Sequence, residues 1–257
     1  MTTVLLTGAS GGIGRELAIQ MASRGMDLIV VARNCDRLSR LADRIRKQHR
    51  VQVDCLACDL GEPDGVASLV RHIADRRIDI LVNNAGRGDY GYFRDIDWAQ
   101  HSCTLRLNVV ALTMLTHAVV PAMIANGSGY IVNIASTASF QPLPWMATYG
   151  ASKAYVLSFG EALAHELEGS GVEVLTLCPG ATKTGFARAA NANDSKNFDD
   201  RTTASVDDVA RYAMSMISER KRGVAVHGLG NRLRALLSKV LPSALTVPMA
   251  GRAMRPR

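Results

Sequence analysis

The chain has 257 residues, of which 47% are apolar and 21% charged, with a formal net charge of +7. A chain of this length fits a doubly wound α/β fold as one domain, and no solenoid-length repeat or low-complexity tract is visible. We therefore predict a single domain over residues 1–257, with 228–257 as a basic C-terminal extension. The longest loop-like stretch, 187–205, is interpreted as a mobile segment rather than a linker.

The positive charge is concentrated at the C-terminal end. Residues 228–257 hold six basic residues and no acidic one, which leaves 24 basic and 23 acidic residues in the rest of the chain. The sequence shows no surface on which basic and aromatic residues alternate. The composition therefore argues against nucleic-acid binding.

The five cysteines are scattered and form no metal-binding pattern. Cys55 and Cys58 form a C-x-x-C pair, but no second pair completes a site, so no metal is predicted. The N-terminus leaves no room for a signal peptide before TVLLTGAS. Since no stretch reaches about 18 uninterrupted apolar residues, we expect a cytoplasmic protein.

Short apolar runs alternate with helical patterns along the chain. Apolar runs at 3–7, 27–33, 51–60, 78–86, 130–136 and 172–180 indicate buried strands, and helical patterns follow at 14–25, 36–48, 65–76, 108–127 and 148–169. This alternation predicts an α/β fold: a Rossmann-type, doubly wound, mostly parallel sheet of about seven strands with helices on both faces. Ligands of such sheets bind at the carboxyl ends of the strands.

A glycine-rich loop, TGASGGIG at 7–14, lies between the first strand and its helix. Gly8 permits a tight turn, Gly12 lets the backbone approach a pyrophosphate, and Gly14 lets the helix pack on the strand. The free N–H groups of the helix N-terminus favour an anion. The loop predicts a dinucleotide site, with Ser10 and Ile13 among its expected contacts.

The end of the second strand indicates which dinucleotide binds. An NAD site usually has an acidic residue there for the ribose 2′-hydroxyl, whereas this strand ends in Ala32 and Arg33. The guanidinium of Arg33 fits a 2′-phosphate, with Arg15 as a second contact. NADP(H) is therefore preferred over NAD(H), and a merely solvated Arg33 is the alternative.

Several further motifs complete a resemblance to the short-chain dehydrogenase/reductase family over roughly residues 3–226. Ser136 ends the fifth strand, Tyr149 and Lys153 form the YGASK motif 13 residues later, and Asn108 follows NNAG. The order and spacing of these motifs, with CDL at 58–60 and PGATKT at 179–184, are similar to those of the family.

The resemblance implies a role for each of these residues. Tyr149 would be the general acid or base, Lys153 would bind the nicotinamide ribose and lower the phenol pKa, Ser136 would orient the substrate oxygen, and Asn108 would hold a water linked to Lys153. A lowered pKa is needed because a free tyrosine, whose pKa is near 10, is a poor base at neutral pH. Further cofactor contacts implied by the resemblance are Asp59, Leu60, Asn83, Ala85, Gly86, Pro179, Gly180, Thr182 and Thr184.

The sequence indicates the substrate only coarsely. The expected substrate walls are 87–93, 137–146 and the segment after Thr184. Their aromatic and apolar residues predict an apolar cavity for a small carbonyl or alcohol (Tyr90, Tyr92, Phe93, Phe140, Leu143, Trp145, Met146). Part of this set would serve equally to cover the sheet ends. A hydrophobic ketone or aldehyde, a steroid or a 3-oxoacyl thioester would fit. The resemblance also implies a homodimer or homotetramer through helices 104–125 and 148–168.

The basic segment 231–257 permits two interpretations. We favour a helix that caps the substrate pocket or packs on a neighbouring subunit over contact with a membrane surface, because Pro242 and Pro248 interrupt a long interfacial helix. For the whole chain, the favoured function is an NADP(H)-dependent carbonyl reductase or alcohol dehydrogenase. The alternatives are an NADP(H)-binding redox sensor without turnover and an epimerase or dehydratase, although the latter usually carry a larger C-terminal domain.

Overall fold

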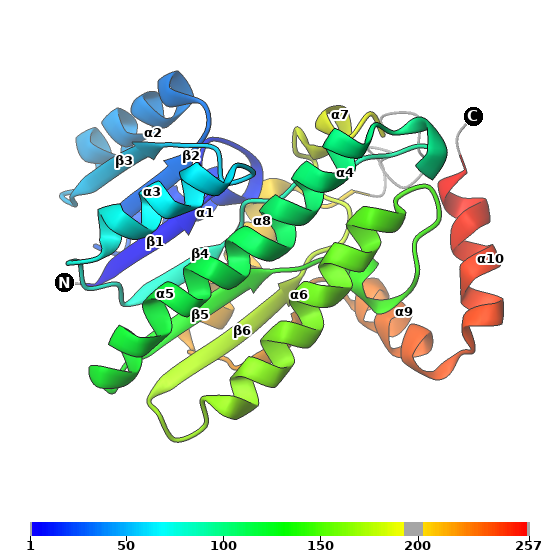
Figure 1. Cartoon of the computed structure of the whole chain (residues 1–257). Coiled ribbons are helices and arrows are strands. Elements are labelled where there is room, and N and C mark those ends of the chain that lie inside the picture. The colour runs from blue at the N-terminus through cyan, green and yellow to red at the C-terminus, as the bar shows by residue number, and fades with distance from the viewer. Residues whose placement is uncertain (1, 193–202, 256–257) are drawn as a thin grey trace.

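The protein is built around one parallel sheet (Figure 1). The computed structural model describes residues 2–192 and 203–255. Within them seven strands pair in the order β3-β2-β1-β4-β5-β6-β7, and every pair is parallel. The strands are β1 (Thr3–Thr7), β2 (Asp27–Ala32), β3 (Val53–Ala57), β4 (Ile80–Asn83), β5 (Gly129–Ile134), β6 (Val172–Cys178) and β7 (Gly223–Val226). The predicted doubly wound Rossmann-type sheet is confirmed.

Helices cover both faces of the sheet, as Figure 1 shows. The helices of the described residues are α1 (Gly12–Ala22), α2 (Cys35–Gln48), α3 (Pro63–Ile73), α4 (Trp98–Leu105), α5 (Leu112–Ala125), α6 (Ala147–Glu166), α7 (Phe186–Ala189), α8 (Val206–Ser218), α9 (Leu229–Val240) and α10 (Ser243–Met254). Alternate side chains of one strand serve opposite faces. Val4 and Leu6 pack with α1, α2 and α8, whereas Leu5 packs with α3 and α5.

The predicted helix at 108–127 is longer than its pattern indicates. It begins at Trp98, and α4 and α5 are joined by a π-helical segment, Arg106–Ala111. The helical segment Trp98–Ala125 is long and apolar enough to cross a membrane, but 44% of its most apolar 18-residue stretch is buried inside the fold. Leu115, Val119 and Met123 pack against the sheet, as expected of a core helix.

The strands predicted at 51–60 and 78–86 end well before their apolar runs do. The run 51–60 pairs only over β3, because the Asp59 carboxylate accepts a hydrogen bond from the Gly61 N–H at 2.8 Å and turns the chain away. The run 78–86 pairs only over β4. Both loops leave the sheet at the carboxyl ends of their strands, and the strand order reverses between β1 and β4, where the ligand crevice is expected.

The last two helices lie beyond the carboxyl end of the sheet (Figure 1). Pro242 separates α9 from α10, and Pro248 lies inside α10. The Trp145 Nε1–H donates to the Gly251 carbonyl at 2.9 Å, and the Tyr90 hydroxyl donates to the Met254 carbonyl at 2.7 Å, so α10 is tied to the loops after β5 and β4. The predicted mobile segment 187–205 lies largely outside the described residues, apart from the end of α7 and a bridge between Thr182 and Ala204.

Candidate active site

A cavity of about 1980 Å³ opens at the carboxyl ends of the strands. The loops after β1 to β6 line one part of it, and α7, α9 and α10 line another. Pockets for one small ligand usually measure about 300–1,000 Å³. The cavity is therefore large enough for a cofactor and a substrate side by side.

The glycine loop has the geometry that a dinucleotide requires. Gly8 has φ +69°, and a Cβ there would lie 2.7 Å from the Asn84 amide nitrogen. A Cβ on Gly14 would lie 2.4 Å from the Gly8 carbonyl oxygen, so Gly14 permits close packing of α1. Gly12 and Ile13, in the first turn of α1, line the cavity, and that turn carries no acidic residue. An anion placed here would meet the helix N-terminus.

Arginines surround the end of the cavity next to β2. Arg33 lies 3.8 Å from Asp59, and both side chains are exposed (66% and 41%). Arg15, Arg37, Arg40 and Arg44 line the same cavity. Of these arginines, only Arg33 and Arg15 were predicted as cofactor contacts. The spacing 37, 40 and 44, on one face of α2, is the signal in the sequence for the others. The site fits a ligand with a phosphate at the ribose 2′-position.

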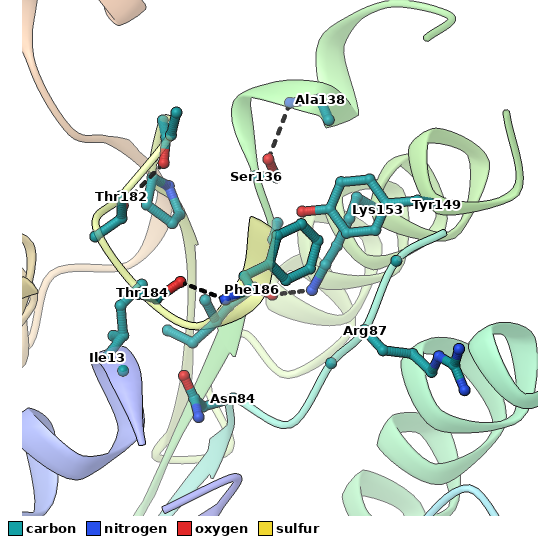
Figure 2. A pocket seen from close by; sticks show the side chains of 18 of the residues that line it. Ile13, Asn84, Arg87, Ser136, Ala138, Tyr149, Lys153, Thr182, Thr184 and Phe186 are labelled. Carbon is teal, nitrogen blue, oxygen red and sulfur yellow. Dashed lines mark hydrogen bonds between the residues drawn. The ribbon is translucent and has the colours of Figure 1, made fainter. Parts of the chain in front are cut away.

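The tyrosine, the lysine and the serine of the sequence motif meet in this cavity (Figure 2). Ser136 caps the short 3-10 helix Thr137–Phe140, and its Oγ accepts from the Ala138 N–H at 3.1 Å. Tyr149 and Lys153 lie one turn apart on α6. The Lys153 Nζ donates to the Ile134 carbonyl at 2.7 Å, which fixes the ammonium at the end of β5.

Burial changes the proton affinities of this pair. Burial raises the pKa of Tyr149, and the hydrogen bond from Ser136 opposes this only in part. Burial also lowers the pKa of Lys153 to about 8. Desolvation therefore dominates at the Tyr149 phenol, and the lowering of its pKa by Lys153 stays a prediction. The Tyr149 phenol is neutral at pH 7, which suits a proton donor.

Asn108 does not line the cavity but hydrogen-bonds residues next to it. Its Nδ2 donates to the Ser152 Oγ at 2.9 Å and to the Arg87 carbonyl at 2.8 Å, and its Oδ1 accepts from the Arg87 N–H at 3.0 Å. A Cβ on Gly86 would lie 3.3 Å from both Asn108 Oδ1 and Lys153 Nζ. Asn108 belongs to the π-helical segment, a feature frequent at functional sites. The water expected beside it stays a prediction.

Asn83 does not line the cavity, contrary to the expectation. It is the last residue of β4, only 4% exposed, and its Nδ2 donates to Thr116 Oγ1 at 3.0 Å and Asn133 Oδ1 at 2.9 Å. Because successive side chains point to opposite sides, the following residue, Asn84, faces the cavity. The Asn84 Nδ2 donates to the carbonyls of Thr7 and Gly8, and so joins the β4 loop to the glycine loop.

Most of the predicted site residues line the cavity. Gly14 and Asn108 lie behind the cavity wall, together with Asn83. The wall itself contains Gly8, Ser10, Gly12, Ile13, Arg33, Asp59, Leu60, Ala85, Gly86, Ser136, Tyr149, Lys153, Pro179, Gly180, Thr182 and Thr184.

The substrate side is built differently from the expectation. Of the predicted apolar wall, only Leu143 and Met146 line the cavity, whereas Phe93 is 63% exposed. The apolar wall instead includes Phe186 from α7, Leu237 and Leu241 from the α9 region, and Met249 and Met254 from α10. Phe186 belongs to the segment after Thr184, which was expected in the wall. A C-terminal helix was expected to cap the pocket, but its wall residues could not be named in advance because they reach the site through tertiary packing. The Phe186 ring lies 5.2 Å from that of Tyr149.

A buried ion pair holds the loop that follows β4. The Arg87 guanidinium lies 2.7 Å from the Asp89 carboxylate, whose other oxygen accepts from the Thr104 hydroxyl of α4. Asp89 is 8% and Arg87 25% exposed. Figure 2 shows the Arg87 side chain turned away from Tyr149 and Lys153. The pair therefore positions the loop rather than the reacting groups.

Comparison with known proteins assigns the chain to a family. The family model described as short chain dehydrogenase matches residues 2–195. Sulfoacetaldehyde reductase 2 of Chromohalobacter salexigens is 36% identical over 252 residues, which cover 95% of this chain and 97% of that protein. The protein belongs to the short-chain dehydrogenase/reductase family, and it is an oxidoreductase of that family.

Solved structures of similar proteins extend over almost the whole chain. A short-chain dehydrogenase from Sphingobium yanoikuyae in complex with NADPH has a TM-score of 0.85 and 36% identity, covering 97% of this chain and 96% of that one. A bulky-bulky ketone specific alcohol dehydrogenase from Comamonas testosteroni has a TM-score of 0.79 and 32% identity, covering 95% and 96%.

Proposed function

We propose that this protein is an NADP(H)-dependent oxidoreductase that interconverts a hydrophobic ketone or aldehyde and the corresponding alcohol. The observation that carries this proposal is that Ser136, Tyr149 and Lys153 line a single cavity with the glycine loop and an arginine-rich end. A reduced nicotinamide bound in this cavity would supply the hydride. The protein's own residues then have to orient the carbonyl and deliver a proton.

Tyr149 is the proton donor in the proposed reduction. Its raised pKa keeps the phenol neutral at pH 7, so that it can protonate the carbonyl oxygen. Ser136 donates a hydrogen bond to the same oxygen and holds it toward Tyr149. Lys153, fixed by the Ile134 carbonyl, places positive charge beside the tyrosinate that remains, and this stabilises it. In alcohol oxidation the same groups act in the reverse direction.

The arginines favour NADP(H) over NAD(H). Arg33 stands where an NAD site would carry an acidic residue, and Arg15 and Arg37 line the same end. The NADPH complex of the relative from Sphingobium yanoikuyae supports this preference. A planar guanidinium binds a 2′-phosphate through paired charge-assisted hydrogen bonds.

The apolar wall favours a hydrophobic substrate. Phe186, Met249 and Met254 line the cavity, and the Phe186 ring packs on that of Tyr149. The similar enzyme from Comamonas testosteroni is described as specific for bulky ketones. We propose assembly into a homodimer or homotetramer as well. It is supported by exposed apolar residues on the helix pair α4–α5, Leu105, Val110 and Met114.

A redox-sensing protein without turnover is the alternative. Such a protein needs the glycine loop and the arginines to bind the cofactor. It does not need Ser136 and Tyr149 to lie together in the same cavity. The test is NADPH oxidation, followed by absorbance, over a panel of bulky ketones, aldehydes, a steroid and a 3-oxoacyl thioester. Turnover by the wild type that falls by about 10²–10⁴ in Tyr149→Phe supports the proposal. NADPH binding without turnover on the whole panel would favour the sensor.

A further inference from the structure

One face of α9 is apolar and open to solvent. The apolar ridge, as we name it, consists of Leu229, Leu233, Leu236, Leu237 and Val240. Leu229 is 81% exposed, Val240 75%, Leu236 61% and Leu233 59%. Spacings of three and four residues place these side chains on a single side of the helix. In a soluble protein such a face is usually turned toward the core.

The ridge is on the side of α9 that points away from the protein. Ala235 is buried, and Asn231 and Ser238 are half-buried. The Asn231 Nδ2 donates to the His227 carbonyl at 2.9 Å, and the Ser238 Oγ donates to Gln141 Oε1 at 3.1 Å. Residues 231, 235 and 238 form the opposite face by the same helical spacing. The helix is therefore docked through its small and polar face, and its leucines are left outside.

Basic side chains flank the ridge. Arg232 and Lys239 lie on one side of it, and Arg234 lies on the other, according to their helical positions. Arg252 and Arg255 add to the charge on α10, and the segment 228–255 contains no acidic residue. Within residues 2–192 and 203–255, the structure records no ion pair for Arg234, Arg252 or Arg255 with a carboxylate. Apolar residues bordered by unneutralised cations are the pattern of a helix that lies in a membrane interface.

We propose that α9 docks this protein on an anionic phospholipid bilayer, with the apolar ridge inserted between the headgroups and the flanking basic residues beside the lipid phosphates. Charge complementarity favours this partner over a second copy of the chain. In a two-fold contact of α9 with itself, basic flanks would face basic flanks, and facing like charges disfavour association. An anionic surface neutralises both flanks at once.

The prolines do not prevent this contact. Pro242 follows the end of α9, so the helix of 12 residues is uninterrupted and extends for about 18 Å along a surface. The two prolines would interrupt one long interfacial helix through 231–257, but the structure has two short helices instead. Only α9 has to lie in the interface.

The ridge also adjoins the mouth of the active-site cavity. Leu237 belongs to both the ridge and the cavity wall, and Leu241 and Met249, which are exposed as well, continue this wall. Docking of α9 would thus place the cavity mouth at the lipid surface, where a hydrophobic molecule partitions. The membrane contact itself does not depend on the proposed reductase activity, and it can be tested separately.

The test is flotation of the full-length protein with vesicles. We expect roughly tenfold more protein with phosphatidylcholine vesicles containing about 30% phosphatidylglycerol than with pure phosphatidylcholine, and a marked loss at about 0.5 M salt. The double variant Leu233→Glu/Leu236→Glu should lose this binding, because it puts charge in the ridge. Trp98→Glu is the matched control: Trp98 is 71% exposed on α4, outside the ridge, and its replacement should leave flotation unchanged.

Other outcomes would overturn the proposal. Wild-type protein that stays at the bottom of the gradient with both vesicle types excludes lipid docking, and this result does not depend on how well any variant folds. If in addition Leu233→Glu/Leu236→Glu reduces the molar mass in light scattering, a second copy covers the ridge. If the double variant retains the wild-type thermal unfolding midpoint and still floats, the ridge is not the contact surface.

Discussion

The Lys153 Nζ donates a hydrogen bond to the carbonyl oxygen of Ile134, the last residue of β5, at 2.7 Å. The lysine is 6% exposed, and burial lowers its pKa to about 8, from an ordinary value of 10.5. The folded protein thus holds a lysine that the unfolded chain protonates more readily. This difference makes stability depend on pH in a defined direction.

The free energy of unfolding should rise with pH because of Lys153. Between about pH 8 and pH 10.5 the unfolded chain binds more protons at this lysine than the folded protein does, so raising the pH favours the folded state. From about pH 7 to pH 10, wild type should gain about 3 kcal/mol relative to Lys153→Met. Urea unfolding of both proteins at a series of pH values measures this gain. Parallel pH curves would show that the lysine has an ordinary pKa in the fold.

Arg33→Ala should weaken NADPH more than NADH. Loss of one charge-assisted contact to the 2′-phosphate should raise KM for NADPH about 10–100-fold and change KM for NADH little. Steady-state kinetics with both cofactors test this expectation. Arg24→Ala is the control, since Arg24 hydrogen-bonds the Gln20 carbonyl on α1 and does not line the cavity. An equal effect on both cofactors would mean that Arg33 does not recognise the phosphate.

Asp89→Ala should destabilise the protein markedly. It leaves the Arg87 guanidinium and the Thr104 hydroxyl without their carboxylate partner, and breaking a buried pair costs about 3 kcal/mol. Asp95→Ala removes an exposed Arg–Asp pair instead, at 3.5 Å from Arg94, and should cost less than about 1 kcal/mol. Denaturant unfolding of the two variants compares them directly. Similar small losses would show that the loop after β4 does not depend on the ion pair.

Trp145→Phe should loosen the substrate wall. It removes the hydrogen bond to the Gly251 carbonyl while it keeps an aromatic ring, and should cost about 1 kcal/mol of stability. We expect KM for a bulky ketone to rise severalfold with little change in kcat, because α10 forms part of the wall and supplies none of the proposed reacting groups. Trp98→Phe, at an exposed position of α4, serves as the control. A fall in kcat at constant KM would place Trp145 in the chemistry instead.

The sequence predicted those features that depend on local pattern and order. The strands follow from apolar runs, and the glycine loop, Ser136, Tyr149 and Lys153 follow from motifs at fixed places relative to these strands. Asn83 and Asn84 could not be told apart, because the residue at which a strand ends decides which of two neighbouring side chains faces the cavity.

Properties that arise from distant parts of the chain were not predictable. The raised pKa of Tyr149 depends on burial by surrounding elements. The wall residues Met249 and Met254 lie on α10, which Trp145 and Tyr90, more than 100 residues earlier in the chain than their hydrogen-bond acceptors, help to hold in place. A basic amphipathic segment indicates a helix, but not which of its faces will be covered.

The attachment of α10 has an evolutionary consequence. Both hydrogen bonds that hold this helix are accepted by main-chain carbonyls, those of Gly251 and Met254. Main-chain acceptors are present whatever side chains the helix carries. Substitutions at Met249, Ala250 or Ala253, which line the cavity, can therefore reshape the pocket while the helix keeps its position. Descendants of this protein could change substrates through a few replacements in one terminal helix, and the reacting groups on α6 would stay untouched.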